Sequence, residues 1–257
     1  ADLIQQLGST ERWTRLKAKQ VLGARNPQQV RGALEKWLAG EAGKLEKNLL
    51  EAVMLMEWMN VADEKLLKRL LASSDYRGRA YAARVAGRWG GRLENPHDIL
   101  EVAAVDAHPR VRMEAVLACA EIPQARSVLI AASVAEGSRD RWIDYAFSQA
   151  VHHLKSLWMP AFRRGELDFG DRGKGLAAVL GQADSKALLA DVRKLLASGE
   201  VDGDGRKALA RALVSAGGDG DIRFLLQGKS LQPDVILITS ARRCDLSPGL
   251  ILSGLYP

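Results

Sequence analysis

Seven alanines recur at nearly regular intervals along the chain. They are separated by 34, 30, 33, 31, 31 and 31 residues and stand at Ala18, Ala52, Ala82, Ala115, Ala146, Ala177 and Ala208. A period of roughly 20–50 residues is typical of stacked repeat proteins, in which each unit buries its apolar face against its neighbours. The period therefore predicts an array of about seven similar units, and such arrays act mainly through an extended surface.

Each unit reads as two helices joined by a short turn. Aromatic residues make up only 5% of the chain, and apolar residues fall at helical spacing, as Val111, Ala115 and Ala118 do. Asn26-Pro27 and Ser74-Asp75 are helix-start signals. The first helices are expected over residues 27–38, 62–72, 96–105, 124–135, 184–197 and 219–226. The second helices are expected to begin near Thr10, Lys44, Asp75, His108, Arg139, Asp171 and Asp204.

Two segments interrupt the period. Residues 155–171 contain several aromatic residues, a proline and glycines, and predict an irregular helix followed by a loop. Residues 228–257 predict a cap or tail, in which the strand-like stretch 234–239 is interpreted as part of a terminal helix pair. Neither interruption is strong enough to split the array, so we expect one all-α domain over residues 1–257.

The repeats resemble a known family. Residues 106–115, Asp-Ala-His-Pro-Arg-Val-Arg-Met-Glu-Ala, are similar to the Asp…Val-Arg-x-x-Ala core of HEAT repeats. This resemblance implies a right-handed, armadillo-like α-solenoid of about seven helical hairpins, in which the second helices line the concave side. The period covers nearly the whole chain, whereas the motif itself is well formed only in the third and fourth units.

A narrower resemblance covers about residues 10–170. The segments that carry it are 57–63, 66–71, 74–80, 108–116 and 142–146. They resemble the HEAT segment of secreted bacterial proteins, of the planctomycete type, described as membrane-bound dehydrogenases with a haem-binding Cys-x-x-Cys-His domain. This chain has no Cys-x-x-Cys-His motif and no propeller, so neither haem attachment nor dehydrogenase activity is carried over. The resemblance implies an exported or periplasmic protein that is the non-catalytic part of a larger oxidoreductase.

Motifs for catalysis and metal binding are missing from the sequence. It contains no His-Glu-x-x-His, no Gly-x-Ser-x-Gly and no Walker-type phosphate loop. His152 and His153 are adjacent, so on a helix they point about 100° apart and cannot chelate from one face. Residues 202–205 lack the spaced acidic ligands of a calcium loop. We therefore predict no catalytic residue, no metal and no cofactor.

Charge and hydropathy leave several classes of partner open. The formal net charge is +6, and acidic and basic residues alternate along the expected helices, which is typical of a solvated surface. This charge permits a nucleic-acid partner without indicating one. No run of 18 apolar residues occurs, so we expect no membrane span. The chain begins at Ala1, and we interpret it as a piece of a longer polypeptide.

One face of the second helices is the candidate binding surface. It is rich in Arg and Tyr, which are common in binding hot spots, although a merely solvated face is the alternative. Its residues are Trp13, Lys17, Arg77, Tyr81, Arg84, Arg88, Arg110, Glu114, Arg141, Tyr145 and His152.

A second set shares one repeat position. Arg15, Arg79 and Arg112 could bind an anionic partner, or they could pair with the turn acids Asp75 and Asp106 and join one repeat to the next. We favour the second interpretation, an inter-repeat arginine ladder.

These observations favour a non-catalytic scaffold that holds a partner protein, or neighbouring domains of the same polypeptide, across the concave repeat surface. The alternative is a basic HEAT-like nucleic-acid-binding protein similar to the alkylpurine DNA glycosylases. A lyase of the HEAT type is a third and weaker hypothesis.

Overall fold

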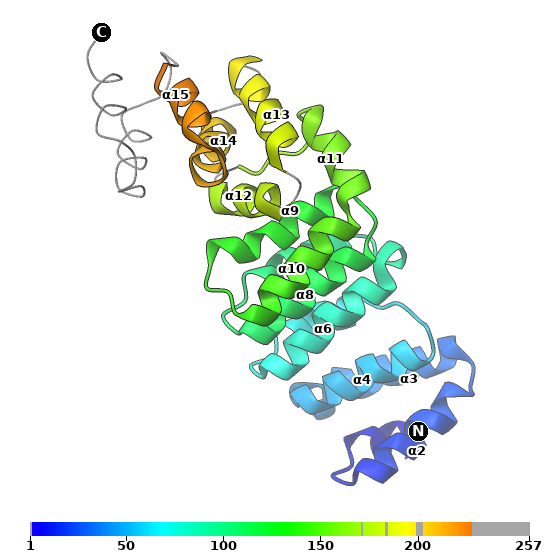
Figure 1. Cartoon of the computed structure of the whole chain (residues 1–257). Coiled ribbons are helices and arrows are strands. Elements are labelled where there is room, and N and C mark those ends of the chain that lie inside the picture. Colours follow the sequence, from blue (N-terminus) through cyan, green and yellow to red (C-terminus); the bar gives the residue numbers. More distant parts are fainter. Residues whose placement is uncertain (1, 171, 183–184, 199–202, 228–257) are drawn as a thin grey trace. The chain divides into compact units, whose positions relative to one another are not determined.

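The computed structural model describes residues 2–170, 172–182, 185–198 and 203–227 (Figure 1). Every regular element in these ranges is a helix, which confirms the expected all-α class. The α-helices are α1 (Asp2–Gln5), α2 (Arg12–Gly23), α3 (Pro27–Ala39), α4 (Glu46–Trp58), α5 (Glu64–Leu71), α6 (Tyr76–Trp89), α7 (Pro96–Ala104), α8 (Pro109–Glu121), α9 (Arg126–Ala132), α10 (Arg141–His153), α11 (Lys155–Arg163), α12 (Gly173–Gln182), α13 (Ser185–Ser198), α14 (Gly203–Ala216) and α15 (Asp219–Gln227). Short 3-10 turns are η1 (Gln6–Gly8), η2 (Glu41–Lys44), η3 (Gly90–Arg92) and η4 (Ser133–Glu136).

The chain forms two compact units. Unit 1 comprises Ala1–Ile122 with Asp140–Ala146, and unit 2 comprises Pro123–Arg139 with Phe147–Pro257. Helix α10 contributes its first half to unit 1 and its second half to unit 2. That the chain is one continuous domain, and that it has about seven repeats, are therefore still predictions.

Local side-chain caps set where the helices begin. Asn26 Oδ1 accepts from the backbone N–H groups of Gln28 and Gln29, and Pro27 follows as the first residue of α3. Asp75 caps α6 by accepting from the Arg77 N–H at 2.9 Å. These are the interactions that helix N-termini need, since their first N–H groups have no helical partner. All seven expected second helices begin within two residues of the predicted positions.

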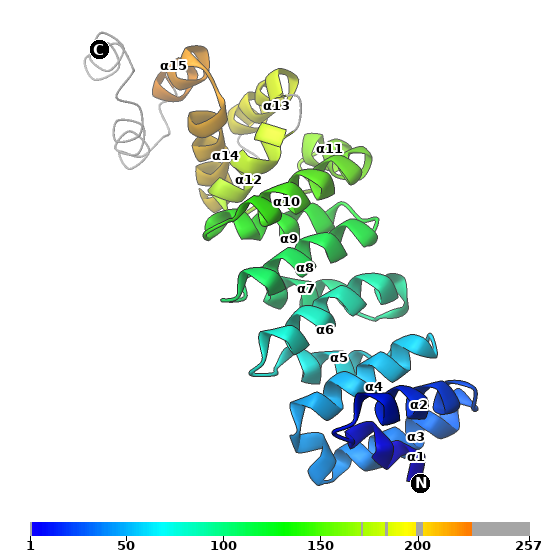
Figure 2. The same cartoon turned by 60° about the horizontal axis from the view of Figure 1, so that its bottom comes forward.

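In unit 1 the second helices pack in succession. Helix α2 packs on α4, α4 on α6, and α6 on α8, while α5 lies against α4 and α6, and α7 against α6 and α8 (Figure 2). The recurring alanines are buried in these contacts: Ala52, Ala82 and Ala115 are 0% exposed. A ladder of small residues lets helix axes approach closely.

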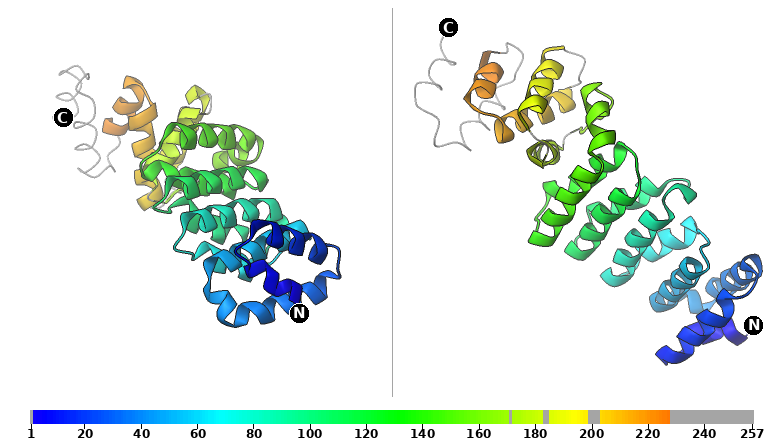
Figure 3. Two further views of the ribbon diagram at one scale, coloured as in Figure 1. Left: turned by 90° about the horizontal axis from the view of Figure 1, so that it is seen from below. Right: turned by 45° about the vertical axis from the view of Figure 1, so that its right-hand side comes forward.

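Helices α6 and α8 approach each other closely and run side by side in both views of Figure 3. A Cβ added at Gly87 would lie 2.7 Å from both Cα and Cβ of Ala118. A side chain at that position would force the two helices apart, so the glycine permits their present separation.

Unit 2 departs from the predicted pattern at two places. The sixth recurring alanine, Ala177, is half-buried, and the close contact of α12 is made instead by Gly175, whose added Cβ would lie 2.8 Å from the Ala132 carbonyl oxygen. The side chain of Ala208 lies outside the described residues, as do 234–239 and the whole expected tail 228–257.

The expected insert 155–171 begins as a regular helix, α11, with Pro160 inside it. The indole of Trp158 is fully buried, and its Nε1 donates to the Val151 carbonyl at 2.9 Å. Phe162 packs edge-on against Phe169, with ring centroids 6.3 Å apart. Burial of these rings holds a helix that the proline alone would disfavour.

Candidate functional site

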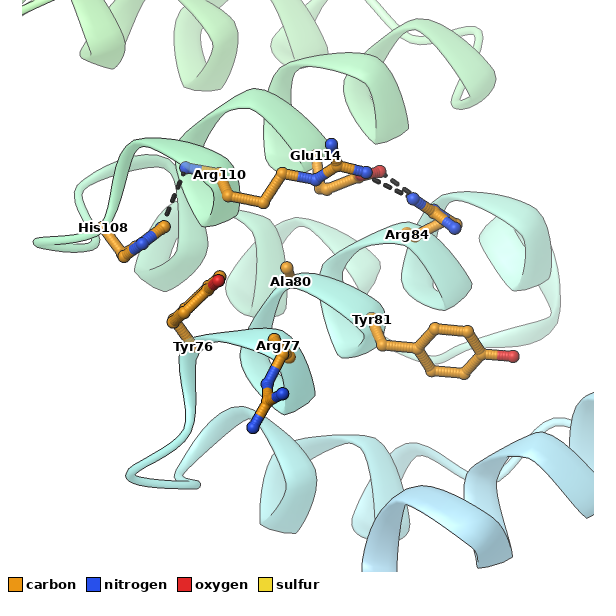
Figure 4. Close-up of a pocket in the computed structure, with 8 residues that line it drawn as sticks. All are labelled: Tyr76, Arg77, Ala80, Tyr81, Arg84, His108, Arg110 and Glu114. Carbon is orange, nitrogen blue, oxygen red and sulfur yellow. Dashed lines mark hydrogen bonds and ion pairs between the residues drawn. The ribbon is translucent and has the colours of Figure 1, made fainter. Parts of the chain in front are cut away.

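Most of the candidate surface residues lie on α2, α6, α8 and the first half of α10, all in unit 1. His152 belongs to the part of α10 in unit 2, where its Nδ1 lies 2.8 Å from the Ser148 carbonyl oxygen. Within unit 1 the structure brings five of the predicted residues together around one hollow between α6 and α8 (Figure 4). These five are Arg77, Tyr81, Arg84, Arg110 and Glu114.

The hollow has a volume of about 400 Å³. Its remaining lining residues, Tyr76, Ala80 and His108, were not among the predicted surface residues. Tyr76 is the first residue of α6, and His108, near which the sequence predicts the start of a second helix, is the N-cap of α8. Their pairing across two helices has no signal in the sequence.

The two rings form an aromatic wall. Tyr76 and His108 stack with ring centroids 3.6 Å apart and an interplanar angle of 7°. His108 Nδ1 accepts from the Arg110 backbone N–H at 3.1 Å and so caps α8. Because an acceptor nitrogen carries no proton, this hydrogen bond requires the tautomer with the proton on Nε2 and fixes the ring plane.

The opposite wall is an ion-pair cluster on Glu114. The Glu114 side chain is 3% exposed and accepts from Arg84 Nε at 3.0 Å and Nη2 at 2.6 Å. Arg110 Nη2 lies 2.7 Å from the same carboxylate. The hydrogen bond with Glu114 raises the pKa of Arg84. Two guanidinium groups thus share one carboxylate, which leaves the cluster with an excess positive charge.

The other two predicted residues have partners next to the hollow. Arg77 makes a forked ion pair with Asp75, and these hydrogen bonds lower the pKa of the Asp75 carboxyl. The Tyr81 hydroxyl points away from the hollow in Figure 4 and donates to Glu57 of α4. Burial, together with that hydrogen bond, raises the pKa of Tyr81. Arg88 pairs with the same Glu57.

The three arginines of the expected ladder make the same contacts with their own turns. In each, Nη1 donates to the carbonyls six and five residues earlier, which are Ser9 and Thr10, Ser73 and Ser74, and Asp106 and Ala107. Arg15 and Arg79 also reach the next second-helix segment: Arg15 Nε lies 2.7 Å from Glu51, and Arg79 binds both Asp106 oxygens at 2.7 and 3.0 Å. Asp75 differs from the expectation, because its forked partner is Arg77 of its own helix.

Other candidate residues stand apart from the hollow. Trp13 is 65% exposed, and Lys17 Nζ lies 4.5 Å from its ring centroid. Tyr145 is 66% exposed. Arg141 stacks over Trp142, an exposed indole that the sequence interpretation did not include, at 4.6 Å. Such cation–π pairs leave most of the aromatic surface in contact with water.

The described residues offer no group of three or more His, Cys, Asp or Glu side chains placed to hold a metal ion. Within the same ranges, no helix combines the length and the apolar character needed to cross a membrane. Cys119 is buried, and burial raises the pKa of its thiol.

No family model matches the chain, and no curated protein is significantly similar to it in sequence.

Proposed function

We propose that this protein is a non-catalytic scaffold that binds a partner protein, or a neighbouring domain of a longer chain, on the face formed by its second helices. The observation that carries the proposal is the hollow between α6 and α8. Five residues expected on this face, from two different helices, line it together. Arg and Tyr in a partly enclosed hollow are the side chains that contribute most to protein–protein affinity.

Pre-organisation supports the same proposal. A long arginine side chain normally loses conformational freedom when a partner binds it. Here Glu114 already holds Arg84 and Arg110, and Asp75 already holds Arg77. Binding therefore costs less ordering entropy than it would on a surface of freely moving side chains.

We further infer that the fold is a HEAT-type α-solenoid. Successive packing of α2, α4, α6 and α8 supports it, as does the identical turn contact of the three ladder arginines. In such a fold the second helices line the concave side, and the hollow would lie in the groove. A solution-scattering profile that requires a compact, near-spherical particle would exclude the solenoid.

The scaffold proposal is tested by affinity capture with the full chain and two matched variants. Arg110→Glu reverses a half-exposed charge at the second position of α8. Lys65→Glu makes the same change at the second position of α5, on a first helix. We expect crosslinks from a specific partner to map to α6 and α8, and Arg110→Glu but not Lys65→Glu to abolish them. Crosslinks that map elsewhere, or that respond equally to both changes, would refute the proposal.

Nucleic-acid binding is the second candidate function. The observation in its favour is the exposed Arg77 and Arg110 beside the Tyr76 ring, since Arg binds phosphate and tyrosine stacks on bases. Its test is a gel shift with single- and double-stranded oligonucleotides over a salt series. The logarithm of the association constant should fall steeply and linearly with the logarithm of salt concentration. No gel shift at low salt would remove this candidate.

A further inference from the structure

The hollow between α6 and α8 is bounded by two kinds of flat surface. At one end is the stacked pair of Tyr76 and His108, with ring centroids 3.6 Å apart. At the other end are the two guanidinium groups held on Glu114. Ala80 lies between these ends in Figure 4, is 6% exposed, and offers only a methyl group. The hollow thus combines π surfaces with a small apolar residue between them.

Both ends of the hollow are held in place by hydrogen bonds within the protein. His108 Nδ1 accepts from the Arg110 backbone N–H at 3.1 Å, and the Tyr76 ring lies within 7° of parallel to the imidazole. Arg84 makes a forked pair with Glu114, through Nε at 3.0 Å and Nη2 at 2.6 Å. A forked pair holds the guanidinium group near the plane of the carboxylate. A flat group can therefore stack here without first ordering these side chains.

The same ion pairs disfavour an anionic ligand. Arg84 uses its Nε and Nη2 on Glu114, and Arg77 uses its Nε and Nη2 on Asp75. An incoming carboxylate or phosphate would be repelled by both acidic side chains. The flat faces of the guanidinium groups and their aliphatic stems are still available. Guanidinium faces of this kind stack on aromatic rings.

The charge of the cluster also disfavours a cationic ligand. Arg84 and Arg110 share the single negative charge of Glu114, so the cluster keeps an excess of one positive charge. A lysine or arginine of a partner would be repelled. An aromatic ring is neutral, and its electron-rich face is attracted to a guanidinium group. Among the side chains that dominate binding hot spots, which are Trp, Tyr and Arg, only Trp and Tyr therefore suit this hollow.

We propose that the hollow between α6 and α8 takes up one aromatic side chain, a tryptophan or a tyrosine, of a partner protein. The inference rests on the proposed scaffold function and names the group by which the partner is anchored. The hollow has a volume of about 400 Å³, near the lower end of the roughly 300–1,000 Å³ of ligand sites. This volume suits a single large side chain.

A nucleobase is also flat, but the contacts around the hollow favour a protein side chain. Each nucleotide brings a negatively charged phosphate with its base. The carboxylates of Asp75 and Glu114 would repel that phosphate, and the arginine nitrogens that form the two forked pairs are already engaged. An uncharged ring therefore fits this site better than a nucleotide.

The test is fluorine NMR on the full chain with N-acetyl-5-fluorotryptophanamide, which is neutral and carries one aromatic side chain. We expect its signal to shift and broaden as protein is added, and N-acetyltyrosinamide to displace it. N-acetylleucinamide, which is apolar but not flat, and thymidine 5′-monophosphate should each compete at least about fivefold more weakly than N-acetyltyrosinamide.

Three variants locate the bound probe. Tyr76→Ala removes one ring of the wall and should weaken binding of the fluorinated probe by at least about fivefold. Tyr76→Phe keeps the ring and should change binding less than twofold. Trp142→Ala is the matched control, because it removes another ring that is 59% exposed and has a guanidinium group over it. It should also change binding less than twofold.

Each other outcome overturns the inference. Equal competition by the leucine and tyrosine derivatives would show a site without preference for rings, and tighter binding of the nucleotide would favour the nucleic-acid function. The inference also fails if Tyr76→Ala binds the probe normally, or loses no more than Tyr76→Phe or Trp142→Ala does. If no probe binds while Arg110→Glu still abolishes partner crosslinks, the aromatic anchor falls and the scaffold proposal stands. The comparison of probes uses the unaltered chain, so it decides even if a variant folds poorly.

Discussion

Replacing Gly87 with alanine tests the close approach of α6 and α8. In the interior of an exposed helix this change stabilises by about 1 kcal/mol, because alanine is the better helix former. At Gly87 the new Cβ would lie 2.7 Å from Cα and Cβ of Ala118. One of these atoms is backbone and cannot rotate away, so the helices must separate. Overpacking of this kind costs about 1–3 kcal/mol.

The steric cost at Gly87 should outweigh the gain in helix propensity. Taking about 3 kcal/mol against about 1 kcal/mol, we expect Gly87→Ala to lower the free energy of unfolding by about 2 kcal/mol. Gly32 is the matched control, since it lies inside α3 with nothing within 4 Å of an added Cβ. Gly32→Ala should therefore stabilise by about 1 kcal/mol. The two variants should differ by about 3 kcal/mol.

Urea denaturation followed by circular dichroism measures both changes. We expect the midpoint to fall for Gly87→Ala and to rise for Gly32→Ala at unchanged slope. Adding Ala118→Gly to Gly87→Ala should recover part of the loss, because it removes one of the two close atoms. If Gly87→Ala stabilised as much as Gly32→Ala, α6 and α8 would not be this close. The hollow that they line would then be wider than described above.

Three further predictions follow from unit 1. Arg79→Lys should lower the free energy of unfolding by about 1–2 kcal/mol, because lysine cannot make the forked bond to Asp106, and an unchanged urea midpoint would refute the ladder contact. The pKa of Glu46 is lowered, mainly by the Ser74 backbone N–H, and that of Asp106 is lowered because its hydrogen bonds outweigh the effect of burial. The stability that these two carboxylates contribute is therefore fully present above their ordinary pKa values of 4.5 and 3.8, and it is lost as the pH falls below those values. The melting temperature should be constant near neutral pH and should fall below about pH 4.5. In a Cys244→Ser variant, Cys119 should react with a thiol reagent only as fast as unit 1 opens, because it is fully buried; reaction at the rate of an exposed thiol would contradict that burial.

The helix pattern could be predicted from the sequence because its signals are local. A cap such as Asn26 and a proline such as Pro27 act within one turn of chain, so they fix the start of α3 without tertiary information. The ladder position could be recognised for a similar reason. The period repeats the same arginine, and the turn carbonyls that it binds lie only five and six residues away.

Other features depend on contacts that the pattern does not encode. The aromatic wall joins Tyr76 to His108 across two helices, and neither residue recurs with the period. Pro160 predicted an irregular segment, whereas burial of Trp158 holds α11 as a helix. The period predicts a buried alanine at Ala177. In unit 2, however, the residue of α12 that makes the close contact is Gly175, two positions earlier. In each case tertiary packing overrides a local preference.

The tertiary hydrogen bonds of unit 1 join residues that are close in sequence. Arg79 reaches Asp106 over 27 residues, Ser74 reaches Glu46 over 28, and Arg84 reaches Glu114 over 30. Contact order is therefore low, and proteins with low contact order fold quickly. A ribosome adds about 5–20 residues per second, so each hairpin should find its partners in chain made only a few seconds before. Unit 1 can thus assemble progressively from its N-terminal end during synthesis. Little of its apolar surface then has to stay exposed until residues distant in sequence are made.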